Sequence, residues 1–503
     1  MSNLSDLLPA GASAKSITAT ASGAIATKKP VILNSAGTIT EVGTSATSQT
    51  IPASGANAAA WWGSGSSFGA AYFSDLATHP TDTTKSIIVY SSSAKGYARV
   101  ITRTGNTVSV GDETEFESSN KANYVSVACG KVSGQFLVYY QDGNGGYPKA
   151  RVGTIDGTTC SFGDVLTVES ASRPYLFLAG DPSTDNKYIV GYKNASNYAE
   201  ARVATVSGTD VTVGGGQAFS NYSGPEHTDC CFDPATAGRF AIISLNGSGD
   251  TPTVLQCTYS GTTVSSTVTY TNCNDDSGKD ARGAYDASTG HLVIAYRDKG
   301  SPYYGCVRVI ESDGTKNTKV DVSSHALDAV GVRCIDVAGD PNNTTRFAVI
   351  YHITSGGNMV RCFQVSGSSG SMTCTLDTQV EVETGPLYKD SCIDYCGDSG
   401  LFQISYQDGP TDTADNKITT CQGAGASVTN LTSTNFLGIA DAAISNSATG
   451  TVVIQGGTIT GLSSLTTGSS YYVQNDGTIT TVSSSVSAGL AISTSKLLLN
   501  GDS

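Results

Sequence analysis

A short glycine turn recurs through this chain at a nearly constant interval. Each of seven glycines stands between two runs rich in Val, Ile and Thr, and the steps between them are 52, 51, 53, 53, 53 and 56 residues: Gly105, Gly157, Gly208, Gly261, Gly314, Gly367 and Gly423. A fixed period of this size is typical of repeat architectures, in which one unit cannot bury its apolar face alone. The repeat therefore constrains the fold more than any single residue does.

A second repeated position accompanies the glycines, and we call the tyrosines at this position the ladder tyrosines. An apolar run ends in tyrosine in six of the seven units, and the fourth unit has Ser244 instead: Tyr90, Tyr140, Tyr192, Tyr296, Tyr351 and Tyr406. A short strand precedes each run, and a polar loop, an Ala-Arg-Val-like strand, the glycine turn and a last strand follow it. Four strands per unit in meander order predict a seven-bladed β-propeller. An open solenoid is the alternative, but it needs polar capping repeats, which the sequence lacks.

Composition supports an all-β protein and excludes several classes of partner. Charged residues are 14% of the chain, against about 25% in average soluble proteins, and Val, Ile, Thr and Tyr favour strands. The net charge of −14 disfavours a nucleic-acid partner and docking on an anionic membrane. No apolar run reaches the ~18 residues of a membrane span, and we expect no signal peptide. The odd count of 13 cysteines predicts free buried thiols, and no histidine stands at ligand spacing to them, so we expect neither metal nor cofactor.

The two ends of the chain carry a shorter duplication. Residues 29–42 (KPVILNSAGTITEV) parallel 469–482 (SSYYVQNDGTITTV), and 435–445 parallel 487–497. A few residues separate the two halves in the second copy, whereas all the repeats separate them in the first. Chain ends that meet in space make such an insertion tolerable. We therefore predict a small split β-domain, built from residues 1–56 (with a linker) and 434–503, into which the propeller of residues 57–433 is inserted.

Both parts resemble sequences of one class of protein. The C-terminal text, which runs from FLGIADAAIS through SSYYVQNDGTITTV to SAGLAISTSKLLL, resembles a module repeated in virion proteins of tailed bacteriophages, especially marine ones. The blade text TGHLVIAYRDKGSPYYGCVRVI resembles a propeller repeat of the same kind of protein. The resemblance implies a non-enzymatic tail fibre, appendage or head decoration, present in several copies and bound to other virion proteins. It further implies assembly in the host cytoplasm and release by lysis, and it carries over no catalytic residue.

The polar loops after the second strand of each blade hold the candidate ligand residues. Aromatic faces beside amide and carboxylate groups suit a sugar, and loops are where binding usually resides. The candidates for a glycan-binding face on the host surface are Tyr147, Tyr198, Tyr303, Tyr304, Asp142, Asn194, Asp298 and Asp408. The alternative is that they are ordinary solvated loops, with Gly and Asn supplied for turn geometry.

Trp61 and Trp62, just before the first blade, are candidates for an interface, because aromatic residues are enriched at such contacts. Two other functions stay open. A propeller glycan-processing enzyme, such as a depolymerase or sialidase, needs two facing carboxylates, yet the Asp-box pattern of sialidases is missing. A bacterial adhesin or lectin needs an export signal.

Overall fold

The computed structural model describes residues 15–46, 59–60, 74–91, 95–104, 107–131, 134–246, 251–266, 269–273, 278–286, 289–298, 305–316, 320–321, 332–340, 345–353, 357–368, 370–377, 379–384, 391–396, 401–407, 416–422, 427–432, 434–484 and 486–500. Every regular element in these ranges is a β-strand, which confirms the all-β prediction. The chain divides into a terminal unit, residues 1–47 with 427–503, and a propeller unit, residues 48–426. None of the described segments is a helix with the length and hydropathy to span a bilayer.

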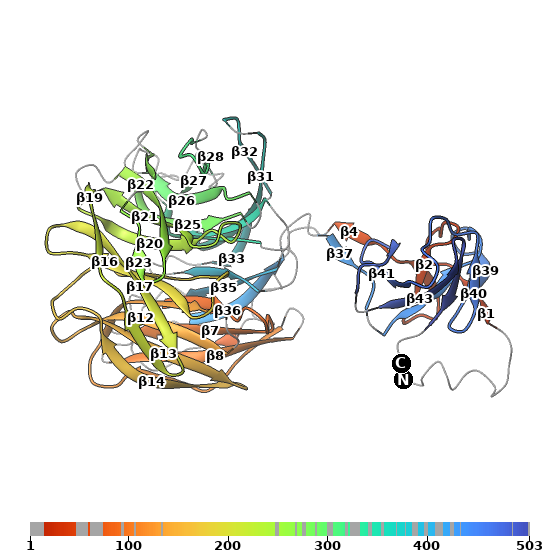
Figure 1. Cartoon of the computed structure of the whole chain (residues 1–503), viewed down its shortest axis with the longest axis horizontal. Coiled ribbons are helices and arrows are strands. Elements are labelled where there is room, and N and C mark those ends of the chain that lie inside the picture. The colour runs from red at the N-terminus through yellow and green to blue at the C-terminus, as the bar shows by residue number, and fades with distance from the viewer. Residues whose placement is uncertain are drawn as a thin grey trace. The chain divides into compact units, whose positions relative to one another are not determined.

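The described strands of the propeller unit form seven antiparallel sheets, which follow one another along the chain (Figure 1). The first holds β6 (Ser74–Thr78), β7 (Lys85–Ser91), β8 (Gly96–Thr104), β9 (Thr107–Val110) and β10 (Thr114–Glu117). The second holds β11 (Ala122–Cys129), β12 (Gln135–Asp142), β13 (Pro148–Asp156) and β14 (Thr159–Thr167). The third holds β15 (Phe177–Gly180), β16 (Lys187–Lys193), β17 (Tyr198–Ser207), β18 (Asp210–Val213) and β19 (Gln217–Ser223).

The remaining four sheets repeat this plan. The fourth holds β20 (Glu226–Phe232), β21 (Arg239–Asn246), β22 (Thr251–Ser260), β23 (Thr263–Val264) and β24 (Thr269–Asn272). The fifth holds β25 (Gly278–Tyr285), β26 (Leu292–Asp298), β27 (Gly305–Ile310) and β28 (Val320–Asp321). The sixth holds β29 (Val332–Gly339), β30 (Arg346–Ile353), β31 (Gly357–Ser366), β32 (Thr373–Leu376) and β33 (Val380–Thr384). The seventh combines β34 (Cys392–Tyr395), β35 (Leu401–Gln407) and β36 (Asn416–Gln422) with β5 (Ala59–Ala60), from near the start of the unit.

The first strands of successive sheets contact one another around a common axis. β6 contacts β11, β11 contacts β15, and the series continues through β20, β25, β29 and β34, which contacts β6 again. The other strands of each sheet lie progressively farther out, as the strand orders show. Sheets that radiate from an axis in this way form a β-propeller.

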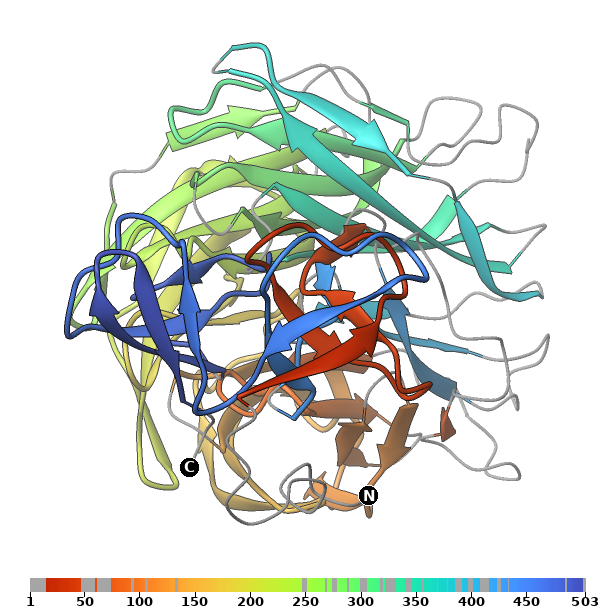
Figure 2. The ribbon, with the colours of Figure 1, turned by 90° about the vertical axis from the view of Figure 1, so that its right-hand side faces the viewer.

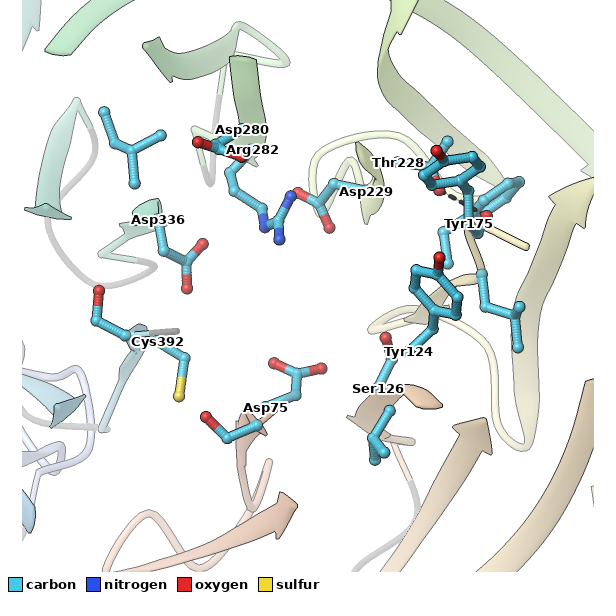
Figure 3. Close-up of a pocket in the computed structure, with 16 residues that line it drawn as sticks. Asp75, Tyr124, Ser126, Tyr175, Thr228, Asp229, Asp280, Arg282, Asp336 and Cys392 are labelled. Atoms are coloured by element: carbon cyan, nitrogen blue, oxygen red, sulfur yellow. Dashed lines mark hydrogen bonds between the residues drawn. The ribbon is translucent and has the colours of Figure 1, made fainter. Parts of the chain in front are cut away.

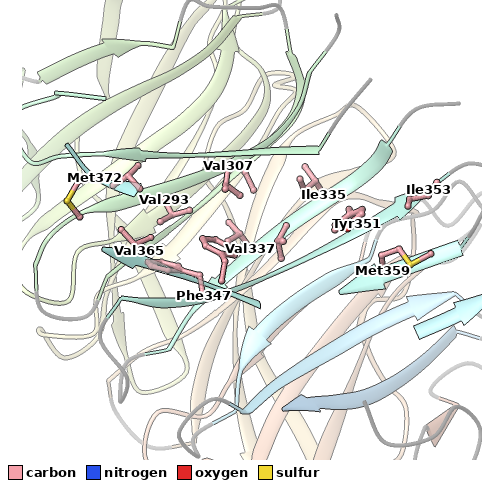
Figure 4. Packing of buried hydrophobic residues seen from close by; sticks show 14 residues of the cluster. Val293, Val307, Ile335, Val337, Phe347, Tyr351, Ile353, Met359, Val365 and Met372 are labelled. Carbon is pink, nitrogen blue, oxygen red and sulfur yellow. The ribbon is translucent and has the colours of Figure 1, made fainter. Parts of the chain in front are cut away.

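Apolar side chains fill the space between neighbouring sheets. One such cluster joins Val293 and Val307 of the fifth sheet to Val337, Phe347 and Tyr351 of the sixth (Figure 4). The ladder tyrosines are at most 1% exposed, and several of their hydroxyls bond to nearby polar side chains, as in the 3.0 Å bond that Tyr140 donates to Glu117. Buried tyrosine usually needs such a partner, so the ladder packs and braces the sheets.

Five of the seven repeating glycines lie in described turns that require their freedom of backbone conformation, and Gly105 and Gly423 lie outside the described residues. Gly157, Gly208 and Gly261 have φ between 61° and 62°, and Gly314 and Gly367 have φ of 89° and 123°. Side chains other than glycine are disfavoured at these angles. The period read from the sequence is therefore a period of left-handed turns between the third and fourth strands.

The terminal unit contains strands from both ends of the chain. One five-stranded sheet has the order β1 (Ser16–Thr20), β39 (Thr449–Val453), β38 (Phe436–Ala440), β2 (Pro30–Leu33) and β3 (Ile39–Glu41), and Figure 2 shows its red and blue strands side by side. A second has the order β40 (Thr458–Thr460), β44 (Lys496–Leu499), β43 (Ser487–Ser493), β41 (Ser470–Val473) and β42 (Ile479–Thr480). The outgoing β4 (Thr44–Ala46) pairs with the returning β37 (Ser427–Thr429) where the chain leaves and re-enters the unit.

Candidate functional site at the channel mouth

One register position of the first strand recurs in all seven sheets and faces the axis. In each sheet, the residue at this position pairs with the second-strand residue that precedes the ladder tyrosine. In the fourth sheet it pairs with the residue that precedes Ser244. In chain order these seven residues, which we call the mouth ring, are Asp75, Ser126, Phe177, Asp229, Arg282, Asp336 and Cys392. All seven line a cavity of about 420 Å³, and Figure 3 shows Asp75, Asp229, Arg282 and Asp336 directed into it.

A distorted backbone places further side chains at this cavity. Tyr124, Tyr175 and Asp280 each stand two residues before a ring residue, and their φ angles are 49°, 56° and 53°. Such angles are uncommon for non-glycine residues and cost about 1–3 kcal/mol each. The pairing of β11 and of β25 shifts register at the same place, and bulges of this kind redirect side chains. The three side chains line the cavity as a result.

The ring carboxyls connect neighbouring sheets. The Asp75 carboxyl accepts hydrogen bonds from the backbone N–H of Leu76 (2.9 Å) in its own strand and of Val127 (2.8 Å) in the next sheet. Asp336 repeats this arrangement, with bonds from Val337 (2.9 Å) and Ile393 (3.0 Å). These bonds hold the carboxyl groups at fixed positions on the cavity wall.

Burial keeps these acids protonated at pH values where ordinary aspartate is charged. Loss of solvation raises the pKa of Asp75 to about 8 and that of Asp336 to about 7. The pKa of Asp229 is also raised by burial, and the nearby Arg282 guanidinium opposes the shift at both Asp229 and Asp336. Near neutral pH the mouth ring therefore offers carboxyl O–H donors as well as carboxyl acceptors.

One wall of the cavity is aromatic. The rings of Tyr124 and Tyr175 lie 5.8 Å apart between centroids, at an interplanar angle of 55°. Thr228 donates a 2.7 Å hydrogen bond to the Tyr175 carbonyl, drawn as a dashed line in Figure 3. The Lys193 ammonium lies 5.3 Å from the centre of the Tyr175 ring. Aromatic faces beside a few convergent polar groups are the usual composition of a small-molecule pocket.

A second cavity, of about 600 Å³, lies at the opposite ends of the first strands. Pro80, Pro182 and Pro234 from the turns after those strands line it, together with aromatic residues such as Phe232 and Tyr285. Fewer polar groups converge on it than on the cavity that the mouth ring lines. We therefore take the cavity of the mouth ring, which we call the channel mouth, as the candidate site. In the described part of the chain, no group of three or more His, Cys, Asp or Glu residues could hold a metal ion.

The loop residues singled out in the sequence lie on separate sheets. Tyr147 is 39% exposed on the β12–β13 loop, which begins after Asp142. Asp142 is buried and accepts a 2.7 Å contact from the Lys149 ammonium, and its other carboxyl oxygen accepts the Asn144 backbone N–H. The Asp142 carboxyl thus organises its own loop.

The loop of the third sheet comes nearer to the mouth. Asn194 accepts backbone hydrogen bonds from Ser196 and Tyr198, and Lys193, the residue before it, is the cation over the Tyr175 ring. Asp298 is buried at the end of β26. Tyr303, Tyr304, Asp408, Trp61 and Trp62 lie outside the described residues, and the glycan-binding role of the whole set stays a prediction.

Sequence reasoning missed the mouth ring. Its members stand fourteen or fifteen residues ahead of the ladder position, so the ladder contained the signal needed to align them. Their residue types differ, however, from carboxylate to guanidinium to phenyl ring. A search for one repeated residue type does not find such a set.

No family model matches the chain, and no curated protein matches its sequence. Among solved structures, the BP39L lectin from Burkholderia pseudomallei is similar over 72% of this chain and 98% of its own, at 9% identity and a TM-score of 0.53. A six-bladed propeller lectin from Aleuria aurantia matches 63% of this chain and 97% of its own, at 13% identity and a TM-score of 0.40. The periplasmic gluconolactonase PpgL from Pseudomonas aeruginosa matches 71% and 97%, at 13% identity and 0.44. With the radial sheets, the likeness to the bacterial lectin assigns the chain to the β-propellers by fold.

Proposed function

We propose that this protein is a non-enzymatic, glycan-binding propeller and that its binding site is the channel mouth. The observation that carries the proposal is the pairing of an aromatic wall, Tyr124 and Tyr175, with hydrogen-bonding groups of the mouth ring in one cavity. A sugar presents C–H faces to aromatic rings and hydroxyls to polar groups, so this lining suits it. The bacterial protein with the similar fold is a lectin, which supports the same class of ligand.

The architecture of this proposal is a closed ring of seven blades. It is supported by the seven described sheets, by the return contact of β34 with β6, and by the pairing of β36 with β5, which joins the last blade to the start of the unit. The ring is inserted into the split domain formed by the two chain ends. Support for the insertion comes from the sheet of the terminal unit that combines strands from both chain ends, and from the β4–β37 pair.

The setting of this proposal is a tailed-phage particle, with the terminal unit as attachment point and the propeller directed at host-surface glycan. The resemblance of both parts of the sequence to virion proteins supports it. Detection of this chain in the proteome of purified virions tests this part, and its absence from the particles would refute the setting without affecting glycan binding.

A glycan array with the full-length chain tests the site. We expect binding that Tyr175→Ala reduces at least tenfold, whereas Tyr147→Ala leaves it unchanged, since Tyr175 lines the cavity and Tyr147 does not. Loss with Tyr147→Ala and none with Tyr175→Ala would move the site to the loops. Release of reducing ends from a bound polysaccharide would show that the enzymatic alternative is correct.

A further inference from the structure

The two sheets of the terminal unit are copies of one fold. Their strand orders correspond one to one: β1, β39, β38, β2 and β3 match β40, β44, β43, β41 and β42. The hairpin bond from Asn34 N–H to the Thr38 carbonyl is 2.8 Å long, as is its equivalent from Gln474 to Thr478. We call the sheet with β1 the first copy and the sheet with β40 the second copy.

The copies stack head to tail, so that opposite faces of the same fold meet. The first copy contributes Ile32, Val42, Ile439 and Val453 to their shared core. The second copy contributes the other face of the sheet: Ile459, Tyr471, Ala488, Ala491, Leu497 and Leu499. In each copy, we call the face equivalent to that of Ile32 and Ile439 the outer face, and the face equivalent to that of Tyr471 and Leu497 the inner face.

The inner face of the first copy is already covered. It forms a separate core, in which Val31, Leu437 and Val452 pack under Ile25 and Ile444. Those two residues come from the β1–β2 and β38–β39 loops, and their backbones bond to each other in both directions at 2.9 Å. The stack is therefore capped at this end by loops of its own chain.

Among the described residues of the terminal unit, none covers the outer face of the second copy in this way. By strand pairing, its residues at the positions of Ile32, Ile439 and Val453 are Tyr472, Leu490 and Leu498, and the hairpin match places Val482 at the position of Val42. The pairing sets Ser487 at the position of Phe436, so the match of 435–445 with 487–497 read from the sequence is wrong by one residue. In the first copy, Ile32, Ile439, Val453 and Val42 are 5%, 0%, 8% and 1% exposed. Tyr472, Leu490 and Leu498 are only partly buried, and Val482 is 66% exposed. Ile492, beside them on β43, is 45% exposed.

We infer that this open outer face is the docking surface for a third sheet of the same pattern, supplied by a different polypeptide. The equivalent face of the first copy shows what covers it: an inner face with small residues, Ala488 and Ala491, opposite the bulky apolar side chains. Within the described residues, a second copy of this chain has no free inner face to offer, because one is stacked and the other lies under Ile25 and Ile444. Repeats that stack in this way stabilise each other through their neighbours.

The test supplies the missing sheet in a full-length chain. A duplicate of residues 457–500 is appended after the C-terminus through a flexible Gly/Ser linker of about 20 residues, which spans roughly 25 Å. Thiol labelling of a Val482→Cys variant is followed by peptide mass spectrometry, with Ala36→Cys in an exposed turn as the reference. We expect labelling at position 482 to slow at least tenfold with the duplicate and to recover when the duplicate carries Leu497→Glu on its inner face.

Two results would overturn the inference. Unchanged labelling at position 482 would do so whether the duplicate is folded or not, since an available docking face would both order and bury it. Protection in the unextended chain that grows with concentration, together with dimers in sedimentation, would identify a second copy of this chain as the occupant. The inference does not depend on glycan binding, so failure of the array leaves it standing.

Discussion

Raising the pH from 5 to 8 should destabilise the propeller, because the mouth carboxyls keep their protons in the folded state. Burial raises the pKa of Asp75 to about 8, whereas aspartate in an unfolded chain has a pKa of about 3.9. Between these values the folded chain binds one proton more than the unfolded chain, so stability falls as pH rises. The stabilising contribution is complete below about pH 4 and lost above about pH 8.

The slope for one such group is about 1.4 kcal/mol per pH unit. From pH 5 to 7, Asp75 alone removes about 2.7 kcal/mol. Asp336, with a pKa of about 7, acts in the same direction, and the two together contribute roughly 5 kcal/mol. Buried Asp394, with a pKa of about 6, adds a smaller amount of the same sign. A unit of this size changes its Tm by roughly 1 °C per kcal/mol, and we expect a fall of 3–5 °C in a scan at constant ionic strength.

Asp75→Asn should flatten this slope. The amide has one acceptor oxygen for the two backbone N–H groups, so the variant starts about 1–3 kcal/mol less stable at pH 5, and the difference narrows by pH 8. The control is Asp313→Asn, since hydrogen bonds from Thr315 lower the pKa of exposed Asp313. That group changes stability only below the window, so the control keeps the wild-type slope. A wild-type Tm that is flat or rising from pH 5 to 7, or an unchanged slope in Asp75→Asn, would refute the reasoning.

Three further predictions concern packing and the terminal unit. Gly153→Ala should cost about 1–3 kcal/mol in urea unfolding, because the new Cβ would lie 2.1 Å from the Phe136 ring; an unchanged midpoint would contradict this packing. Tyr140→Phe should cost about 1–2 kcal/mol, since Glu117 loses a buried donor, and equal stability would mean that water replaces the hydroxyl. The terminal unit, with its two segments joined by the short β42–β43 connection of the second copy, should fold alone with strand-type circular dichroism; a disordered spectrum would show that it needs the propeller.

Much of the fold could be predicted from local patterns. The five described glycines between third and fourth strands have left-handed φ, and turns with such angles favour glycine, which makes them visible in the sequence. The ladder tyrosines are buried in every described sheet that has one, so one packing position repeats with one residue type. The duplicated hairpins at the chain ends likewise share their turn chemistry, as the matching bonds of Asn34 and Gln474 show.

The mouth ring could not be predicted in the same way. The sequence by itself determined strands, turns and their period, because each depends on residues within a few positions of one another. Asp75 and Asp336 are 261 positions apart and line one cavity only because the first strands converge on one axis. Their raised pKa values arise from burial in that cavity. The left-handed backbone at Tyr124 and Tyr175 could not be predicted either, because neither position holds a glycine. Convergence and desolvation are properties of the assembled sheets, so the tertiary structure alone decided where the candidate site lies.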